Sequence, residues 1–185
     1  MDVTDQKSPL TPDGLIQDLI SFTEENCSSN FQDFQERLES ESIEYGVSEE
    51  TLTEIFLANS SETRIRMLPW FVIANLAVAS VYFLGRHDKN WVRQALQELK
   101  LSVLQRFGGV LGDDACHPLE TVTRIMREGI FDAYEAGALA FLTEIGYLDH
   151  PDSTSATLDP NFLKKIRLDF SRTIPFLHDA GPLLK

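Results

Sequence analysis

Three histidines of this chain stand directly beside an aspartate, a pairing that metal-dependent hydrolases use. The pairs are His87-Asp88, Asp149-His150 and His178-Asp179. A metal-dependent phosphohydrolase of the His-Asp type needs a further histidine upstream of its His-Asp pair, and no histidine precedes His87. The pattern is therefore incomplete. We instead expect Asp88 to cap a helix, because its carboxylate can accept hydrogen bonds from free backbone N–H groups.

Two polar loops hold the remaining residue types that could bind a metal. The first loop contributes Asp113, Asp114, Cys116 and His117, and the second contributes Asp149, His150 and Asp152. If the loops were adjacent, their thiol, imidazoles and carboxylates could form a mixed metal site. One cysteine and one histidine nevertheless lack the paired spacing that makes zinc motifs specific. A helical metalloenzyme that uses the His117 and His150 loops stays an alternative, but we expect no metal, no cofactor and no catalytic residue.

Phosphate and nucleic-acid binding are disfavoured. The glycine-rich stretch 108–112 follows a predicted helix rather than a strand, and it lacks the Lys-Ser/Thr ending of a phosphate loop. Basic residues are dispersed, and only Lys164, Lys165, Arg167 and Arg172 lie close together on one predicted helix. We therefore expect no nucleic-acid partner.

The net negative charge of the chain lies in its first third. Residues 1–62 hold fifteen acidic side chains and two basic ones, Lys7 and Arg37, whereas residues 63–185 are neutral overall. Such an asymmetric field attracts cationic partners and repels nucleic acid and anionic membranes. The charge therefore indicates which part of the chain meets a partner.

Seven carboxylates of this region are candidates for a partner-binding surface, because apolar residues at helical spacing place them on structured helices. They are Glu24, Glu25, Asp33, Glu36, Glu39, Glu41 and Glu44. An oriented anionic surface speeds association and sets specificity. The expected partner is a basic protein, and an inhibitor, immunity-type protein, chaperone or adaptor would act in this way. The alternative is a charged face that only keeps the protein soluble.

Large aromatic residues between positions 70 and 141 suggest a different function. An apolar ligand pocket between helices could be lined by Trp70, Phe71, Tyr82, Phe83, Trp91, Phe131, Tyr134 and Phe141. The same rings could equally fill a close-packed core. A helical ligand-binding domain is thus the second hypothesis.

The elements that position these residues are predicted to be helices throughout. In the acidic third, 11–62, Thr11-Pro12 starts a helix that reaches about Cys27, and Phe31, Phe34 and Leu38 mark a second one. Ser48 is a predicted N-cap for a short third helix. We find no period-two alternation typical of strands.

In the charge-balanced part, 63–185, further signals predict the remaining helices. Gly108-Gly109 should end the helix that Asp88 caps, and one long amphipathic helix should run from His117 to Ile145. A polar loop follows at 146–159, and Asp159-Pro160 begins a last helix that reaches about Pro175.

The run from Met67 to Gly85 has no charged residue and approaches the length of a membrane span. Basic residues flank it on both sides, so the positive-inside rule favours no orientation. Asn75 and Ser80 lie within it, and apolar stripes elsewhere can cover it. We therefore expect a buried central helix at about 68–84 rather than a membrane span.

Together these patterns predict an all-α protein, a helical bundle of roughly six to eight helices around the central apolar helix. We expect a loose tail at 1–10 and a single domain over 11–185. The two cysteines, Cys27 and Cys116, are too few to cross-link a secreted fold. With no signal-peptide pattern at the start, we expect a cytoplasmic protein.

Overall fold

The computed structural model describes residues 12–56, 60–84, 87–148 and 158–171, and this part of the chain is helical without any strand. The all-α prediction is confirmed. Its α-helices are α1 (Pro12–Glu44), α2 (Glu49–Ile55), α3 (Ser60–Leu84), α4 (Lys89–Leu111), α5 (His117–Glu128), α6 (Ala133–Glu144) and α8 (Pro160–Ile166). Two 3₁₀ helices, η1 (Gly112–Cys116) and η3 (Arg167–Ser171), follow α4 and α8. The predicted tail at 1–10 and most of the predicted loop at 146–159 lie outside the described residues.

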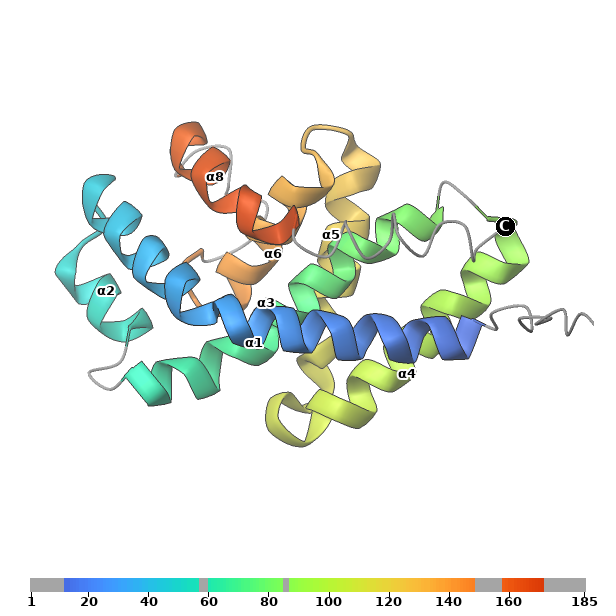
Figure 1. Ribbon diagram of the computed structural model, residues 1–185. Coiled ribbons are helices and arrows are strands. Elements are labelled where there is room, and N and C mark those ends of the chain that lie inside the picture. The colour runs from blue at the N-terminus through green and yellow to red at the C-terminus, as the bar shows by residue number, and fades with distance from the viewer. Residues whose placement is uncertain (1–11, 57–59, 85–86, 149–157, 172–185) are drawn as a thin grey trace, which may run out of the picture.

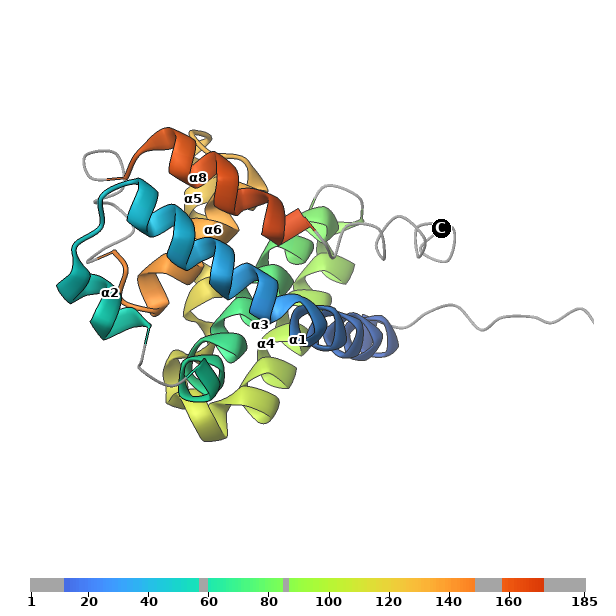
Figure 2. The ribbon, with the colours of Figure 1, turned by 60° about the vertical axis from the view of Figure 1, so that its left-hand side comes forward.

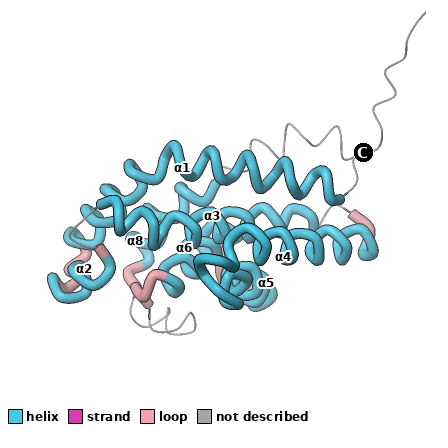
Figure 3. The backbone as a smooth tube through the Cα atoms, turned by 90° about the horizontal axis from the view of Figure 1, so that it is seen from below, coloured by secondary structure: helices cyan, strands magenta, loops and turns pink. Residues whose placement is uncertain are grey.

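Helix α3 runs through the middle of the bundle. Figure 3 shows α1 on one side of α3, with α5 and α6 on the other, and α3 packs against all three as well as against α4. Every residue from Phe71 to Ser80 is buried. The side chains of Asn75 and Ser80 donate hydrogen bonds to carbonyls of their own helix, Phe71 O and Ala77 O, which explains how polar groups fit within this run.

By length and composition, the stretch Ser61–Tyr82 is the one described helix that could cross a membrane. Its position at the centre of the bundle fits the predicted central helix, because a core helix meets the same criteria.

Helix α1 is one continuous helix of 33 residues, so the prediction of two helices that part near Cys27 was wrong. The buried positions Thr23, Cys27, Phe31, Phe34 and Leu38 continue one stripe at intervals of three and four. Ser and Asn favour helix ends, but here their side chains bond to carbonyls within the helix: Ser29 Oγ to Glu25 O and Asn30 Nδ2 to Asn26 O. Such bonds bend helices, and α1 changes direction near its middle (Figure 1).

Three predicted caps are confirmed. The backbone N–H of Thr51 donates to Ser48 Oγ at 3.2 Å, and Asn161 N donates to Asp159 Oδ1 at 2.7 Å. Asp88 Oδ1 accepts from Asn90 N at 2.9 Å and from Trp91 N at 3.1 Å. The carboxylate of the His87-Asp88 pair is therefore engaged in helix capping.

The predicted helix end at Gly108-Gly109 was wrong, because α4 continues to Leu111. Gly112 ends it with a φ of 70°, in the region that glycine adopts at no steric cost. Gly108 and Gly109 lie within the helix and have no positive φ. Glycine lowers the stability of a helix but does not by itself end it.

The predicted single helix from His117 to Ile145 is also wrong, since Gly129 separates α5 from α6 with a φ of 71°. A capping box then starts α6: Glu135 N donates to Asp132 Oδ1, and Asp132 N donates to Glu135 Oε2. The last helix ends earlier than predicted. It becomes the 3₁₀ helix η3 after Ile166, and positions 172–175 lie outside the described residues.

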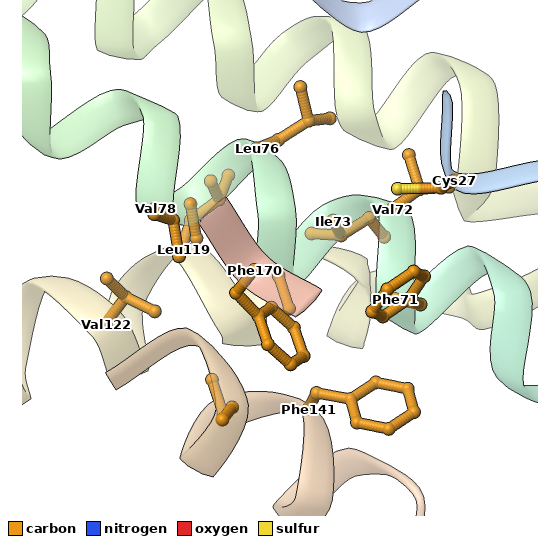
Figure 4. Close-up of a cluster of buried hydrophobic side chains, with 14 of the residues drawn as sticks. Cys27, Phe71, Val72, Ile73, Leu76, Val78, Leu119, Val122, Phe141 and Phe170 are labelled. Carbon is orange, nitrogen blue, oxygen red and sulfur yellow. The ribbon is translucent and has the colours of Figure 1, made fainter. Parts of the chain in front are cut away.

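Five phenylalanines from four elements form the centre of the core. Phe34 of α1 stacks on Phe71 of α3 with ring centroids 4.1 Å apart. Figure 4 shows Phe71, Phe141 and Phe170 facing one another, and the ring centroids of Phe71 lie 5.7 and 5.2 Å from those of the other two. Phe31 completes the group against Phe71 at 5.9 Å. These rings join α1, α3, α6 and η3 into one core.

Candidate functional site

The structure separates the seven predicted partner-binding carboxylates into two groups. Glu24 forms an ion pair with Arg106 of α4. Glu41 and Glu44 both accept from Lys165 Nζ of α8, at 2.6 and 3.3 Å. Helix α8 lies beside the C-terminal half of α1, as Figures 1 and 2 show. These three carboxylates therefore hold neighbouring helices to α1.

The other four, Glu25, Asp33, Glu36 and Glu39, are exposed and form no ion pair within the described residues. We call these four the free carboxylates because they pair with no cation; Glu36 Oε1 accepts a hydrogen bond from Gln32 Nε2 at 3.0 Å. Intervals of eleven and three residues, about three turns and one turn, place Glu25, Glu36 and Glu39 on one side of α1. This side lies opposite the buried stripe of α1, which packs into the core. The geometry thus leaves a compact anionic strip pointing to solvent.

The one cation of α1 does not neutralise this strip. Arg37 forms a two-pronged ion pair with Asp169 of η3: Nη2 donates to Oδ1 at 2.7 Å and Nε donates to Oδ2 at 3.2 Å. Only 5% of the Asp169 side chain is exposed. Arg37 is 40% exposed, but both of its hydrogen bonds go to Asp169, so α1 supplies no cation that pairs with the free carboxylates.

An exposed isoleucine lies within the same strip and was not predicted. Ile43 is 61% exposed, and with Glu36, Glu39 and Ser40 it lines a surface depression of about 300 Å³. Its position seven residues after Glu36 places it on the same side of the helix. In the sequence, Ile43 is an apolar residue out of phase with the buried stripe of α1, and this spacing could have identified it as exposed.

The predicted aromatic pocket residues fall into separate places. Tyr82 and Tyr134 meet, with their hydroxyl oxygens 3.0 Å apart, and burial raises the pKa of Tyr134 to about 12. Phe71 belongs to the phenylalanine core described above. Trp91 stacks on His87 with centroids 4.1 Å apart. Trp70 and Phe131 are partly buried against the core, as Tyr82, Trp91 and Tyr134 are.

A cavity of about 320 Å³ lies elsewhere, between α3, α4 and α5. Leu96, Leu99 and Leu119 form an apolar part of its lining. Charged side chains of α4 and α5 complete it: Lys100, Glu120, Arg124 and Arg127. None of these residues was among the predicted pocket residues, because the cavity arises from how three helices meet rather than from a local motif.

His117 lies between two carboxylates. Its Nε2 is 3.5 Å from Asp114 Oδ1, and its Nδ1 is 3.9 Å from Glu144 Oε1. Burial raises the pKa of the Glu144 carboxyl and that of the Cys116 thiol, which disfavours the thiolate form that nucleophilic chemistry needs. Within the described residues, no group of three or more His, Cys, Asp or Glu side chains could hold a metal ion. His150 lies outside the described part.

No protein-family model, no curated protein and no solved structure matches this chain.

Proposed function

We propose that this protein acts by binding a basic protein partner through the outer face of α1, as an inhibitor, immunity-type protein, chaperone or adaptor would. The observation that carries the proposal is the sorting of charge on α1. Glu24, Glu41 and Glu44 pair with cations of other helices, whereas the four free carboxylates are exposed and pair with no cation of the described residues. A surface of this kind steers a cationic partner and orients it.

The depression around Ile43 adds a chemical preference. A lysine or arginine of the partner can lay its aliphatic stem on Ile43 while its charge reaches Glu36 and Glu39. The strip from Glu25 to Ile43 is about 27 Å long, which suits a helix or extended segment with several cations along one side. The expected partner surface is therefore basic with apolar side chains between the charges.

Affinity capture from lysate with two matched variants tests this proposal. The face variant carries Glu25→Gln, Asp33→Asn, Glu36→Gln and Glu39→Gln. The control variant carries Glu49→Gln, Glu50→Gln, Glu54→Gln and Glu62→Gln, all of them exposed positions of the same acidic third but not on α1. Both variants change the net charge by the same amount, so only the position of the lost charge differs.

We expect wild type and the control variant to retain the same basic protein, and high salt to release it. The face variant should bind that protein at least about tenfold more weakly, because several exposed charge contacts are lost together. Quantitative mass spectrometry measures the retained amounts. Equal loss from both variants would contradict the proposal, because bulk charge would then explain the capture.

A further inference from the structure

The cavity between α3, α4 and α5 combines an apolar floor with a cationic rim. Leu99 is fully buried and Leu119 nearly so, whereas Lys100, Glu120 and Arg127 are exposed. Ser80 of α3 also lines the floor, but its hydroxyl already donates to Ala77 O. A floor with so few polar groups holds water poorly and favours an apolar occupant.

The rim is positive in a protein that is strongly negative overall. Three cations and one carboxylate surround the opening, whereas the chain as a whole carries −13. Lys100 Nζ donates to Glu120 Oε1 at 2.8 Å, and this hydrogen bond lowers the pKa of the Glu120 carboxyl. Arg124 pairs with Glu128 at 3.7 Å. Exposed pairs of this kind are weak, so a ligand can compete for their cations.

Arg127 is the rim cation best placed for a ligand. It is exposed and forms no ion pair within the described residues. It follows Arg124 by three residues on α5, so the two guanidinium groups project from the same side of the helix. Two guanidinium groups above an apolar floor match a carboxylate that carries an apolar chain.

We propose that this cavity binds an organic anion with an apolar tail, of the size of a medium-chain carboxylate. The tail lies against Leu96, Leu99 and Leu119, and the carboxylate meets Arg127 and Arg124 at the rim. A volume of about 320 Å³ is at the small end of the range for ligand sites. The proposal is independent of the acidic face of α1, which lies on other residues.

Calorimetric titration of the full chain with decanoate, below its micelle concentration, tests the proposal, with decanamide as the uncharged probe of equal chain length. We expect decanoate to bind about tenfold more tightly than decanamide, because only the carboxylate forms charge-assisted hydrogen bonds with the rim. Arg127→Gln should remove most of this difference, by weakening decanoate binding far more than decanamide binding. Arg93→Gln is the matched control, since it removes an exposed arginine of α4 that does not line the cavity.

A second variant addresses the floor. Thr123 lines the cavity and is only partly buried, so Thr123→Phe should place a ring in the cavity and abolish binding of both probes while the circular dichroism spectrum stays helical. Equal affinity for decanoate and decanamide, an equal effect of Arg93→Gln and Arg127→Gln, or unchanged binding by a folded Thr123→Phe protein would each overturn the assignment. Absence of decanoate binding would overturn it as well.

Discussion

Arg37→Ala is expected to lower the free energy of unfolding by about 2 kcal/mol, because it removes the partly exposed guanidinium that pairs with a buried carboxylate. Asp169 is 4% exposed, and Arg37 donates to both of its oxygens. The pair also joins α1 to η3, whose Phe170 packs on the phenylalanine core. Urea unfolding followed by circular dichroism measures the change, and an unchanged m-value confirms that the same surface unfolds.

Arg106→Ala is the control for this substitution. Arg106 also pairs with a carboxylate across helices, but its partner Glu24 is 27% exposed, whereas Asp169 is 5% exposed. Removal of such a pair should cost less than about 1 kcal/mol. Asp169→Asn introduced into the Arg37→Ala protein should recover part of the loss, because it removes the buried charge. Equal stability of the two alanine variants would contradict a larger contribution of the Arg37–Asp169 pair.

Gly137→Ala is expected to destabilise the protein by about 2 kcal/mol, although alanine favours helices over glycine. A Cβ at this position of α6 would overlap Cγ2 of Val78 and lie 3.3 Å from Cδ1 of Phe170. Valine has a stiff χ1, and Val78 is fully buried, so α3 and α6 would have to separate. Figure 4 shows Val78 and Phe170 within the packed cluster where this close approach occurs.

Two comparisons make this prediction specific. Gly109→Ala in α4 should stabilise the protein by about 0.5–1 kcal/mol, because a Cβ there meets nothing within 4 Å. In a Val78→Ala background, Gly137→Ala should be neutral or stabilising, since the overlapping methyl group is gone. Thermal or urea unfolding of wild type, Gly137→Ala, Val78→Ala and the double variant gives the coupling energy between the two positions. Additive effects of the two substitutions would contradict the close contact between α3 and α6.

Local sequence rules predicted the helix starts well. Ser48, Asp88 and Asp159 cap the helices they were expected to cap, because a cap depends on one side chain and the backbone directly after it. The same rules were wrong for α1. Asn26 to Asn30 have the composition of a helix boundary, but tertiary packing of Cys27 and Phe31 keeps the helix intact through this stretch.

The division of the acidic surface could not be predicted from the sequence. Lys165 reaches Glu41 across 124 positions of the chain, and no periodicity or spacing records that contact. Nor could the sequence show that Arg37 faces Asp169 instead of its acidic neighbours on α1. The cavity rim has the same origin, because Lys100 of α4 and Arg127 of α5 line one cavity only once the bundle has folded.

In the proposed function, the position of the negative charge, and not only its amount, makes the outer face of α1 a binding surface. The most direct measurement is an NMR titration of the ¹⁵N-labelled protein with a helical peptide that carries arginines along one side and leucines between them. We predict amide shift changes concentrated between Glu25 and Ile43, lost in the face variant and kept in the control variant at Glu49, Glu50, Glu54 and Glu62. Shift changes spread evenly over α1 and α2, or lost equally in both variants, would contradict the claim.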